Sequence, residues 1–172
     1  MRSLTTFLAL AIALPALAQT KQDRPGIVNF TRVDAVVACG GATETAALDG
    51  LKADGFKAVI NLRLPTEPGA NIEANAAHAK ALGLNYVNIP FNGQQPDPKA
   101  VDTFLATISN KANQPVFVHC GSASRVGSMW LVKRVLQDGW TVEKATEEAK
   151  LIGLRSEPLE KFAIEYINSH KK

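Results

Sequence analysis

Short apolar runs alternate with amphipathic stretches along the chain from residue 28 onward. The runs that predict strands cover residues 28–33, 35–38, 57–62, 84–90 and 115–119. The stretches in which apolar side chains recur at helical spacing begin near residues 43, 71, 97, 126, 141 and 156. We therefore expect one α/β domain over residues 28–170, with a central, mainly parallel sheet flanked by helices on both faces.

Residues 1–18 have a different pattern. Arg2 precedes an apolar run over residues 7–14, and the segment ends in Ala16-Leu17-Ala18. This order is typical of a secretory signal, and the run is shorter than the roughly 20 residues that span a bilayer. The alternative is a buried N-terminal helix. We expect cleavage after Ala18, a linker over residues 19–27, and a periplasmic or secreted protein without a membrane span.

Composition and charge narrow the functional classes. The chain is 46% hydrophobic and 20% charged, which fits a folded domain rather than a disordered one. Its net charge is +3, or +2 once Arg2 is removed, and the charges are dispersed. We therefore expect no binding to nucleic acid. The two cysteines and three histidines lack the spacing of metal ligands, so no metal or cofactor is expected. Nothing in the sequence indicates the oligomeric state.

The segment after the strand at 115–119 carries the clearest chemistry. Cys120 is followed by Gly121, Ser122, Ala123 and Ser124, and then by Arg125 and a predicted helix. Ligands bind at the carboxyl ends of parallel strands, where small residues let backbone N–H groups converge on an anion. Such surroundings favour a thiolate, and a guanidinium presents a fork to two anion oxygens. These residues predict an anion site with Cys120 as nucleophile, Arg125 as clamp and residues 121–125 as hydrogen-bond donors.

This segment resembles the signature of the protein tyrosine and dual-specificity phosphatases. The likeness consists of His119-Cys120, the small loop, Arg125-Val-Gly and the helix, within a broader similarity over residues 28–168. It is nearest to a bacterial phosphatase-like branch grouped with beta-lactamase-hydrolase-like proteins. The resemblance implies a tyrosine-phosphatase-like fold and a phosphocysteine on Cys120. It also implies a phosphate-binding Arg125, a phosphorylated small molecule or protein as substrate, and no metal.

Two positions depart from that signature. The usual loop has five residues between cysteine and arginine, whereas this chain has four, as in the rhodanese-type sulfurtransferases. Val126 stands where many phosphatases place Ser or Thr. Two alternatives therefore stay open: a sulfurtransferase that carries a persulfide on Cys120, and an anion-binding domain without catalysis.

Two charged side chains have both a functional and a structural interpretation. Phosphatase chemistry needs an acid for the leaving oxygen, and Asp97 is the candidate in the loop before the helix at 97–108. Asp97 could instead cap that helix. Arg63 could line the pocket, or it could pair with Glu67 or Glu73, which is the interpretation that we favour.

The remaining candidates surround Cys120. His119 could steady the loop or be an ordinary core histidine, and Cys120 itself could be an inert buried thiol. Arg125 could form a surface salt bridge. Cys39 ends a predicted strand, so it could share a sheet edge with Cys120 and form a disulfide that silences the nucleophile.

Overall fold

The computed structural model describes residues 19–171, so the expected signal at 1–18 lies outside the described residues. The strands are β1 (Thr20–Lys21), β2 (Thr31–Arg32), β3 (Val37–Gly40), β4 (Ala58–Asn61), β5 (Asn85–Asn88) and β6 (Val116–His119). The α-helices are α1 (Ala47–Ala53), α2 (Ile72–Ala81), α3 (Pro98–Ser109), α4 (Ser124–Leu136), α5 (Val142–Ile152) and α6 (Glu157–His170), and a 3-10 turn, η1, covers Lys111–Asn113.

The strands form one sheet in the order β1-β2-β3-β6-β4-β5. β3, β6, β4 and β5 run parallel, while β1 and β2 add an antiparallel edge. β6 therefore lies between two parallel neighbours, with His119 opposite Gly40 on β3 and Asn61 on β4. The mainly parallel sheet expected from the sequence is confirmed, and its central strand leads directly into Cys120.

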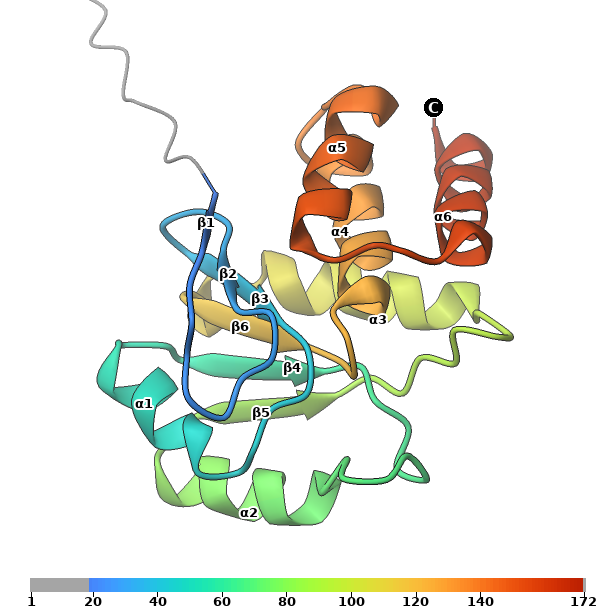
Figure 1. The fold of residues 1–172 in the computed structure, drawn as a ribbon. Helices are drawn as coiled ribbons and strands as arrows, with labels where there is room; N and C mark the ends of the chain where they lie inside the picture. The colour runs from blue at the N-terminus through green and yellow to red at the C-terminus, as the bar shows by residue number, and fades with distance from the viewer. Residues whose placement is uncertain (1–18, 172) are drawn as a thin grey trace, which may run out of the picture.

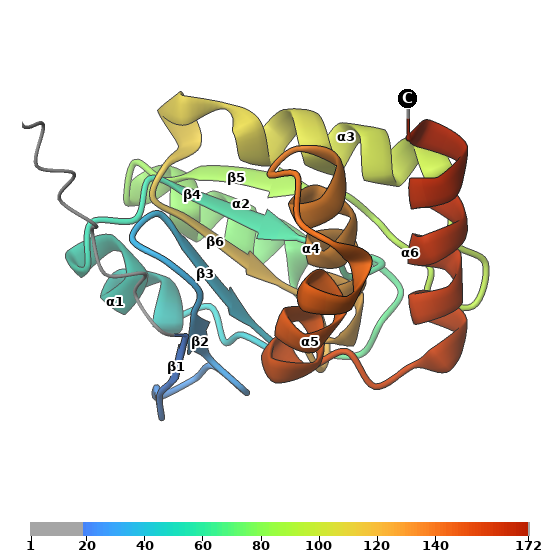
Figure 2. The same ribbon diagram turned by 90° about the horizontal axis from the view of Figure 1, so that it is seen from above.

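Helices cover both faces of the sheet (Figures 1 and 2). α1 and α2 lie on one face, and α3, α4, α5 and α6 lie on the other. Apolar side chains form a core on each face of the sheet. Successive β6 side chains point to opposite faces, so Val116 and Val118 pack on the α4 side and Phe117 packs on the α1 side. Burial of β6 on both faces explains its apolar run of Val116, Phe117 and Val118.

Three local expectations need correction. Two residues of the expected linker pair with β2 as β1, so part of the linker belongs to the sheet. The helix expected to begin near residue 43 begins at Ala47 as α1, and the Thr43 hydroxyl donates to the Gly41 carbonyl. α4 begins at Ser124, two residues before the expected start. The later start of α1 follows from contacts of the preceding residues, since Ala42 donates to the Gly121 carbonyl and Thr43 pairs with Ile27.

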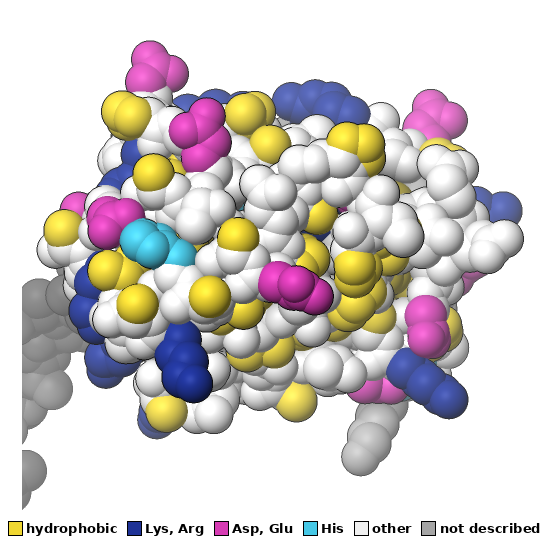
Figure 3. Space-filling model, turned by 90° about the horizontal axis from the view of Figure 1, so that it is seen from below, with side chains coloured by type: hydrophobic (Ala, Val, Ile, Leu, Met, Phe, Trp, Pro, Cys, Tyr) yellow, Lys and Arg dark blue, Asp and Glu magenta, His cyan; other side chains and the backbone are white. Residues whose placement is uncertain are grey.

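The surface shows mixed charge. Seen from the α2 side, acidic and basic side chains are interspersed and do not gather by sign (Figure 3). Within residues 19–171, no helix combines the length and the apolar character that crossing a bilayer requires.

Candidate active site

Four loops meet at one edge of the sheet. They follow the carboxyl ends of β3, β4, β5 and β6, the end at which open parallel sheets bind ligands. Cys120 is the first residue after β6, and its N–H donates to the Gly40 carbonyl at 3.3 Å. The Cys120 side chain is almost wholly buried, with 1% exposed, so the sulfur lies at the base of the loop.

In the loop over residues 121–125, the first two carbonyl groups accept hydrogen bonds from neighbouring segments and the third accepts from α4. The Gly121 carbonyl accepts from the Ala42 N–H at 2.8 Å, and the Ser122 carbonyl accepts from the Asn29 amide at 3.4 Å. The Ala123 carbonyl accepts from Gly127 within the first turn of α4. No acceptor within residues 19–171 takes the N–H groups of residues 121–125. The loop thus presents five free donors beside a helix N-terminus, as an anion site requires.

The shape of this loop depends on an unusual residue conformation. Ala123 has φ +74°, in the left-handed region that L-residues rarely adopt. Gly153, at the end of α5, packs against it so closely that a Cβ at position 153 would lie 2.9 Å from the Ala123 Cβ and 2.8 Å from the Asn29 amide. The junction after α5 and the Asn29 side chain therefore hold the loop from outside.

Arg125 converges on the same site as Cys120. One terminal nitrogen donates to the Leu62 carbonyl at 3.2 Å, the Phe91 carbonyl at 3.0 Å and a Glu67 oxygen at 2.6 Å, while the other donates to Glu67 at 2.8 Å. Burial lowers the pKa of Arg125, but Glu67 and the Cys120 sulfur oppose this effect, so its pKa lies above the ordinary value. The guanidinium is fixed in place next to the thiol.

Glu67 was expected only as a partner of Arg63, but it also binds Arg125. It joins Arg125 to Arg63, whose Nε donates to it at 3.1 Å, and it also accepts from the Leu64 N–H. Burial raises the pKa of Glu67, yet the bonds from Arg125, Leu64 and Arg63 outweigh burial and lower it to about 2. The expected structural pairing of Arg63 with Glu67 is confirmed, and its effect is to hold the carboxylate against the clamp.

His119 takes no direct part in this arrangement. Its ring is 1% exposed and stacks on Phe117 with ring centroids 5.6 Å apart. Both ring nitrogens are buried, and neither has a hydrogen-bond partner within residues 19–171. Burial, together with the charge of Arg63, lowers the pKa of His119 to about 3, so the ring is neutral. It fills the core beneath the loop and does not transfer protons.

Cys39 and Cys120 are both free thiols, so the disulfide suggested by the sequence is not formed. Cys39 pairs in register with Val118, which places Cys120 two residues further along the neighbouring strand. With strands about 4.8 Å apart and a rise of about 3.3 Å per residue, the Cα atoms lie about 8 Å apart. A disulfide needs roughly 4.4–6.8 Å. Sharing a sheet edge is therefore not enough to join them.

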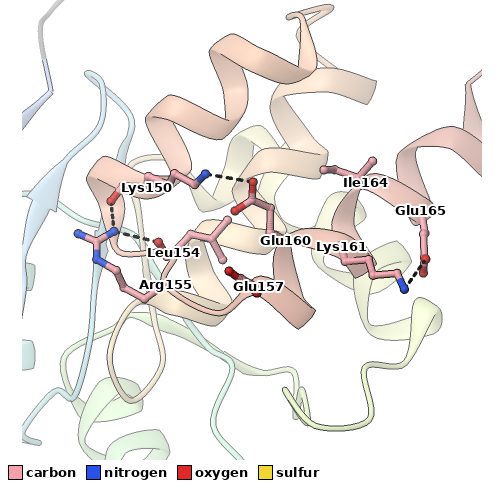
Figure 4. A pocket seen from close by; sticks show the side chains of 8 residues that line it. All are labelled: Lys150, Leu154, Arg155, Glu157, Glu160, Lys161, Ile164 and Glu165. Atoms are coloured by element: carbon pink, nitrogen blue, oxygen red, sulfur yellow. Dashed lines mark hydrogen bonds and ion pairs between the residues drawn. The ribbon is translucent and has the colours of Figure 1, made fainter.

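A shallow hollow of about 250 Å³ opens above Arg125. It is lined by Gly93, Gln94, Ser122, Ser124, Arg125, Ser156 and Leu159. A larger groove of about 750 Å³ lies along the other side of the α6 N-terminus, and four of its charged side chains form two ion pairs, Lys150 with Glu160 and Lys161 with Glu165 (Figure 4). The smaller hollow is the candidate site, because Arg125, which lines it, interacts with the Cys120 sulfur.

Asp97 does not line the hollow above Arg125. Its carboxylate accepts from the Lys99 N–H at 2.9 Å and caps α3, and the residue is exposed. The structure therefore assigns Asp97 the capping role, while Gln94, three residues earlier in the same loop, reaches the hollow. A glutamine in a polar loop gave no sequence signal for this position.

Known structures share this architecture. A crystal structure from Shewanella putrefaciens CN-32, provisionally described as a phosphatase (DUF442), superposes with a TM-score of 0.72, covering 86% of this chain and 94% of that one at 19% identity. P. aeruginosa TpbA in complex with pTyr superposes with a TM-score of 0.67, covering 90% and 91% at 17% identity. These likenesses confirm the tyrosine-phosphatase-like fold.

Sequence comparison identifies the family. A beta-lactamase hydrolase-like protein of Agrobacterium fabrum (strain C58) is 29% identical over 113 residues, which are 63% of this chain. The chain spans about a quarter of that relative's length, 26%. The family model described as "DSP-PTPase phosphatase fused to NAD+ Kinase" matches residues 12–165. The chain therefore belongs to the DSP-PTPase phosphatases, a family of phosphoric monoester hydrolases.

Proposed function

We propose that the chain hydrolyses phosphate monoesters through a phosphocysteine on Cys120. The sulfur attacks phosphorus, the P–O bond to the alcohol breaks, and the leaving oxygen takes a proton from solvent in the open hollow. Water then attacks phosphorus, the P–S bond breaks, and inorganic phosphate and the thiolate are released. Arg125 and the N–H groups of residues 121–125 hold the phosphoryl oxygens throughout.

One observation carries this proposal: the Arg125 guanidinium interacts with the Cys120 sulfur, and the N–H groups of residues 121–125 have no backbone acceptor within residues 19–171. A nucleophile, a positive clamp and oxyanion donors are the parts that acyl or phosphoryl transfer through a covalent intermediate requires. The complex of TpbA with pTyr supports a phosphate monoester as the ligand.

The test measures phosphate release from 4-nitrophenyl phosphate in the presence of reductant. We expect Cys120→Ser to abolish turnover. Arg125→Lys should lower kcat/KM by at least about 100-fold, because lysine cannot present a planar fork. Cys39→Ala is the matched control and should retain activity, since Cys39 lies in the core away from the hollow. A Cys120→Ser protein as active as wild type would contradict the proposal.

The four-residue spacing between Cys120 and Arg125 favours sulfur transfer as a second candidate function, which the same Cys120→Ser variant tests. Since rhodanese-type sulfurtransferases share this spacing, Cys120 could carry a persulfide instead of a phosphoryl group. Thiocyanate formation from thiosulfate and cyanide, abolished by Cys120→Ser, together with no release of phosphate, would assign the chain to sulfur transfer.

We also propose that residues 1–18 direct export. The motif is the positive start, the apolar run and the Ala-Leu-Ala ending described above. Expression of the full chain in a bacterium, followed by intact mass measurement of the periplasmic fraction, should give a protein that begins at Gln19. Recovery of the uncleaved chain in the cytoplasm would contradict export.

A further inference from the structure

We propose that the hollow above Arg125 binds the alcohol part of a polyol phosphate, such as a sugar or cyclitol phosphate. The inference rests on the proposed function, because it names the substrate class of the same site. Its basis is the polar rim, which we define as Gln94, Ser122, Ser124 and Ser156. These four side chains account for most of the lining around the phosphate clamp.

Two hydroxyl groups of the polar rim are held in place by the backbone and remain able to donate. Ser124 Oγ accepts from the Arg155 N–H at 3.1 Å, and Ser156 Oγ accepts from the Leu159 N–H at 3.4 Å as the cap of α6. Each hydroxyl keeps its own hydrogen to donate. A ligand beside Arg125 therefore meets several neutral donors that are held in position by the chain around them.

Nothing in the hollow suits an aromatic leaving group. Leu159 is the only large apolar side chain among the lining residues, and it is 3% exposed. A phenyl ring would cover the hydroxyl groups without replacing their hydrogen bonds to water, which costs affinity. Hydroxyl groups of a polyol would replace those bonds.

The hollow does not suit a second phosphate group either. Arg155 directly precedes Ser156, but its guanidinium donates to the Lys150 and Leu154 carbonyls (Figure 4), and Arg155 does not line the hollow. Arg125 is therefore the only charged side chain among the lining residues. One clamp for phosphate and a rim of neutral donors match a monophosphate of a polyol.

The test measures binding, so that differences in leaving-group reactivity do not enter. Full-length Cys120→Ser protein is titrated calorimetrically with myo-inositol 1-phosphate, O-phospho-L-tyrosine and inorganic phosphate. We expect the inositol phosphate to bind at least about tenfold more tightly than inorganic phosphate, because each hydrogen bond contributes a factor of about two to ten. Phosphotyrosine should bind no more tightly than inorganic phosphate.

Ser156→Gly in the same background separates the hydroxyl from the helix cap, since glycine caps a helix at a cost of only a few tenths of a kcal/mol. We expect it to lower the ratio of inositol phosphate affinity to inorganic phosphate affinity about three- to tenfold. Ser169→Ala, at the far end of α6, should leave the ratio unchanged. Tighter binding of phosphotyrosine than of the inositol phosphate, or an unchanged ratio in Ser156→Gly, would overturn the inference. Loss of all phosphate binding would instead contradict the proposed function.

Discussion

At the scale of single residues, Glu67 determines whether Arg125 is available as a clamp. It binds Arg125 through both carboxylate oxygens and is itself held by Arg63. We expect Glu67→Gln to lower kcat/KM for 4-nitrophenyl phosphate about 10- to 100-fold, since a displaced guanidinium no longer matches the phosphoryl oxygens. Glu67→Asp keeps the charge and should recover part of the loss. Equal activity of wild type and Glu67→Gln would show that Arg125 needs no carboxylate.

The same carboxylate affects stability at acid pH. Its pKa falls from an ordinary value of 4.5 to about 2 on folding. The stabilisation is complete above about pH 4.5 and is lost as the pH falls towards 2, because the unfolded chain takes up the proton first. It amounts to on the order of 3 kcal/mol. Urea unfolding across this range should show a shallower decline for Glu67→Gln than for wild type.

His119 should determine how the free energy of unfolding depends on pH in a range above that of Glu67. The pKa of His119 falls from 6.5 to about 3 on folding. Between these values the ring binds a proton in the unfolded state but not in the folded state. The free energy of unfolding should therefore decrease as the pH falls from about 6.5 to 3. His119→Phe removes the titration and two unpartnered nitrogens, so we expect its stability at pH 7.5 to stay within about 1 kcal/mol of wild type. A decline of the same slope in both proteins would exclude His119 as its source.

At the scale of elements, the start of α3 gives a test of Asp97. Asparagine caps a helix as well as aspartate but cannot donate a carboxylic proton. We expect Asp97→Asn to retain activity within about threefold, whereas Asp97→Ala loses about 1 kcal/mol of stability. If Asp97 were the general acid, Asp97→Asn would lose about 10²- to 10⁴-fold in kcat. The rate with 4-nitrophenyl phosphate and with an alkyl phosphate, together with the thermal midpoint, separates the two roles.

Elements also show what the sequence could predict. The apolar pattern located every strand from β2 to β6, and Asp97, Thr141 and Ser156 marked the starts of α3, α5 and α6 because capping is a local interaction. The predicted start of α1 was wrong because Ala42 donates to the Gly121 carbonyl and Thr43 pairs with Ile27, long-range contacts that no local pattern reveals. Cys120 and Arg125 were predictable from their spacing, whereas Glu67, Asn29 and Gln94 reach the site through long-range contacts.

At the scale of the whole molecule, the strand register of the sheet determines whether the two thiols can form a disulfide. β3 and β6 are adjacent and parallel, yet their register leaves Cys39 and Cys120 diagonal to each other rather than opposite. Cys39 is wholly buried, and burial, followed by the charges of Glu148 and Asp34, raises its thiol pKa well above the ordinary value. A protonated thiol is a poor nucleophile towards an oxidised partner. The sheet therefore separates the thiols geometrically and keeps one of them unreactive.

Mild oxidation of the purified protein tests this separation. After treatment with diamide and unfolding in denaturant, iodoacetamide should label both cysteines, because closing a disulfide would require the strands to shift register by about two residues. Cys39→Ala provides the one-label reference. An intact mass 2 Da below that of the dithiol form, on the order expected from the loss of two hydrogens, would show that β3 and β6 can slide past their observed register. Activity would then respond to redox conditions despite the geometry of the sheet.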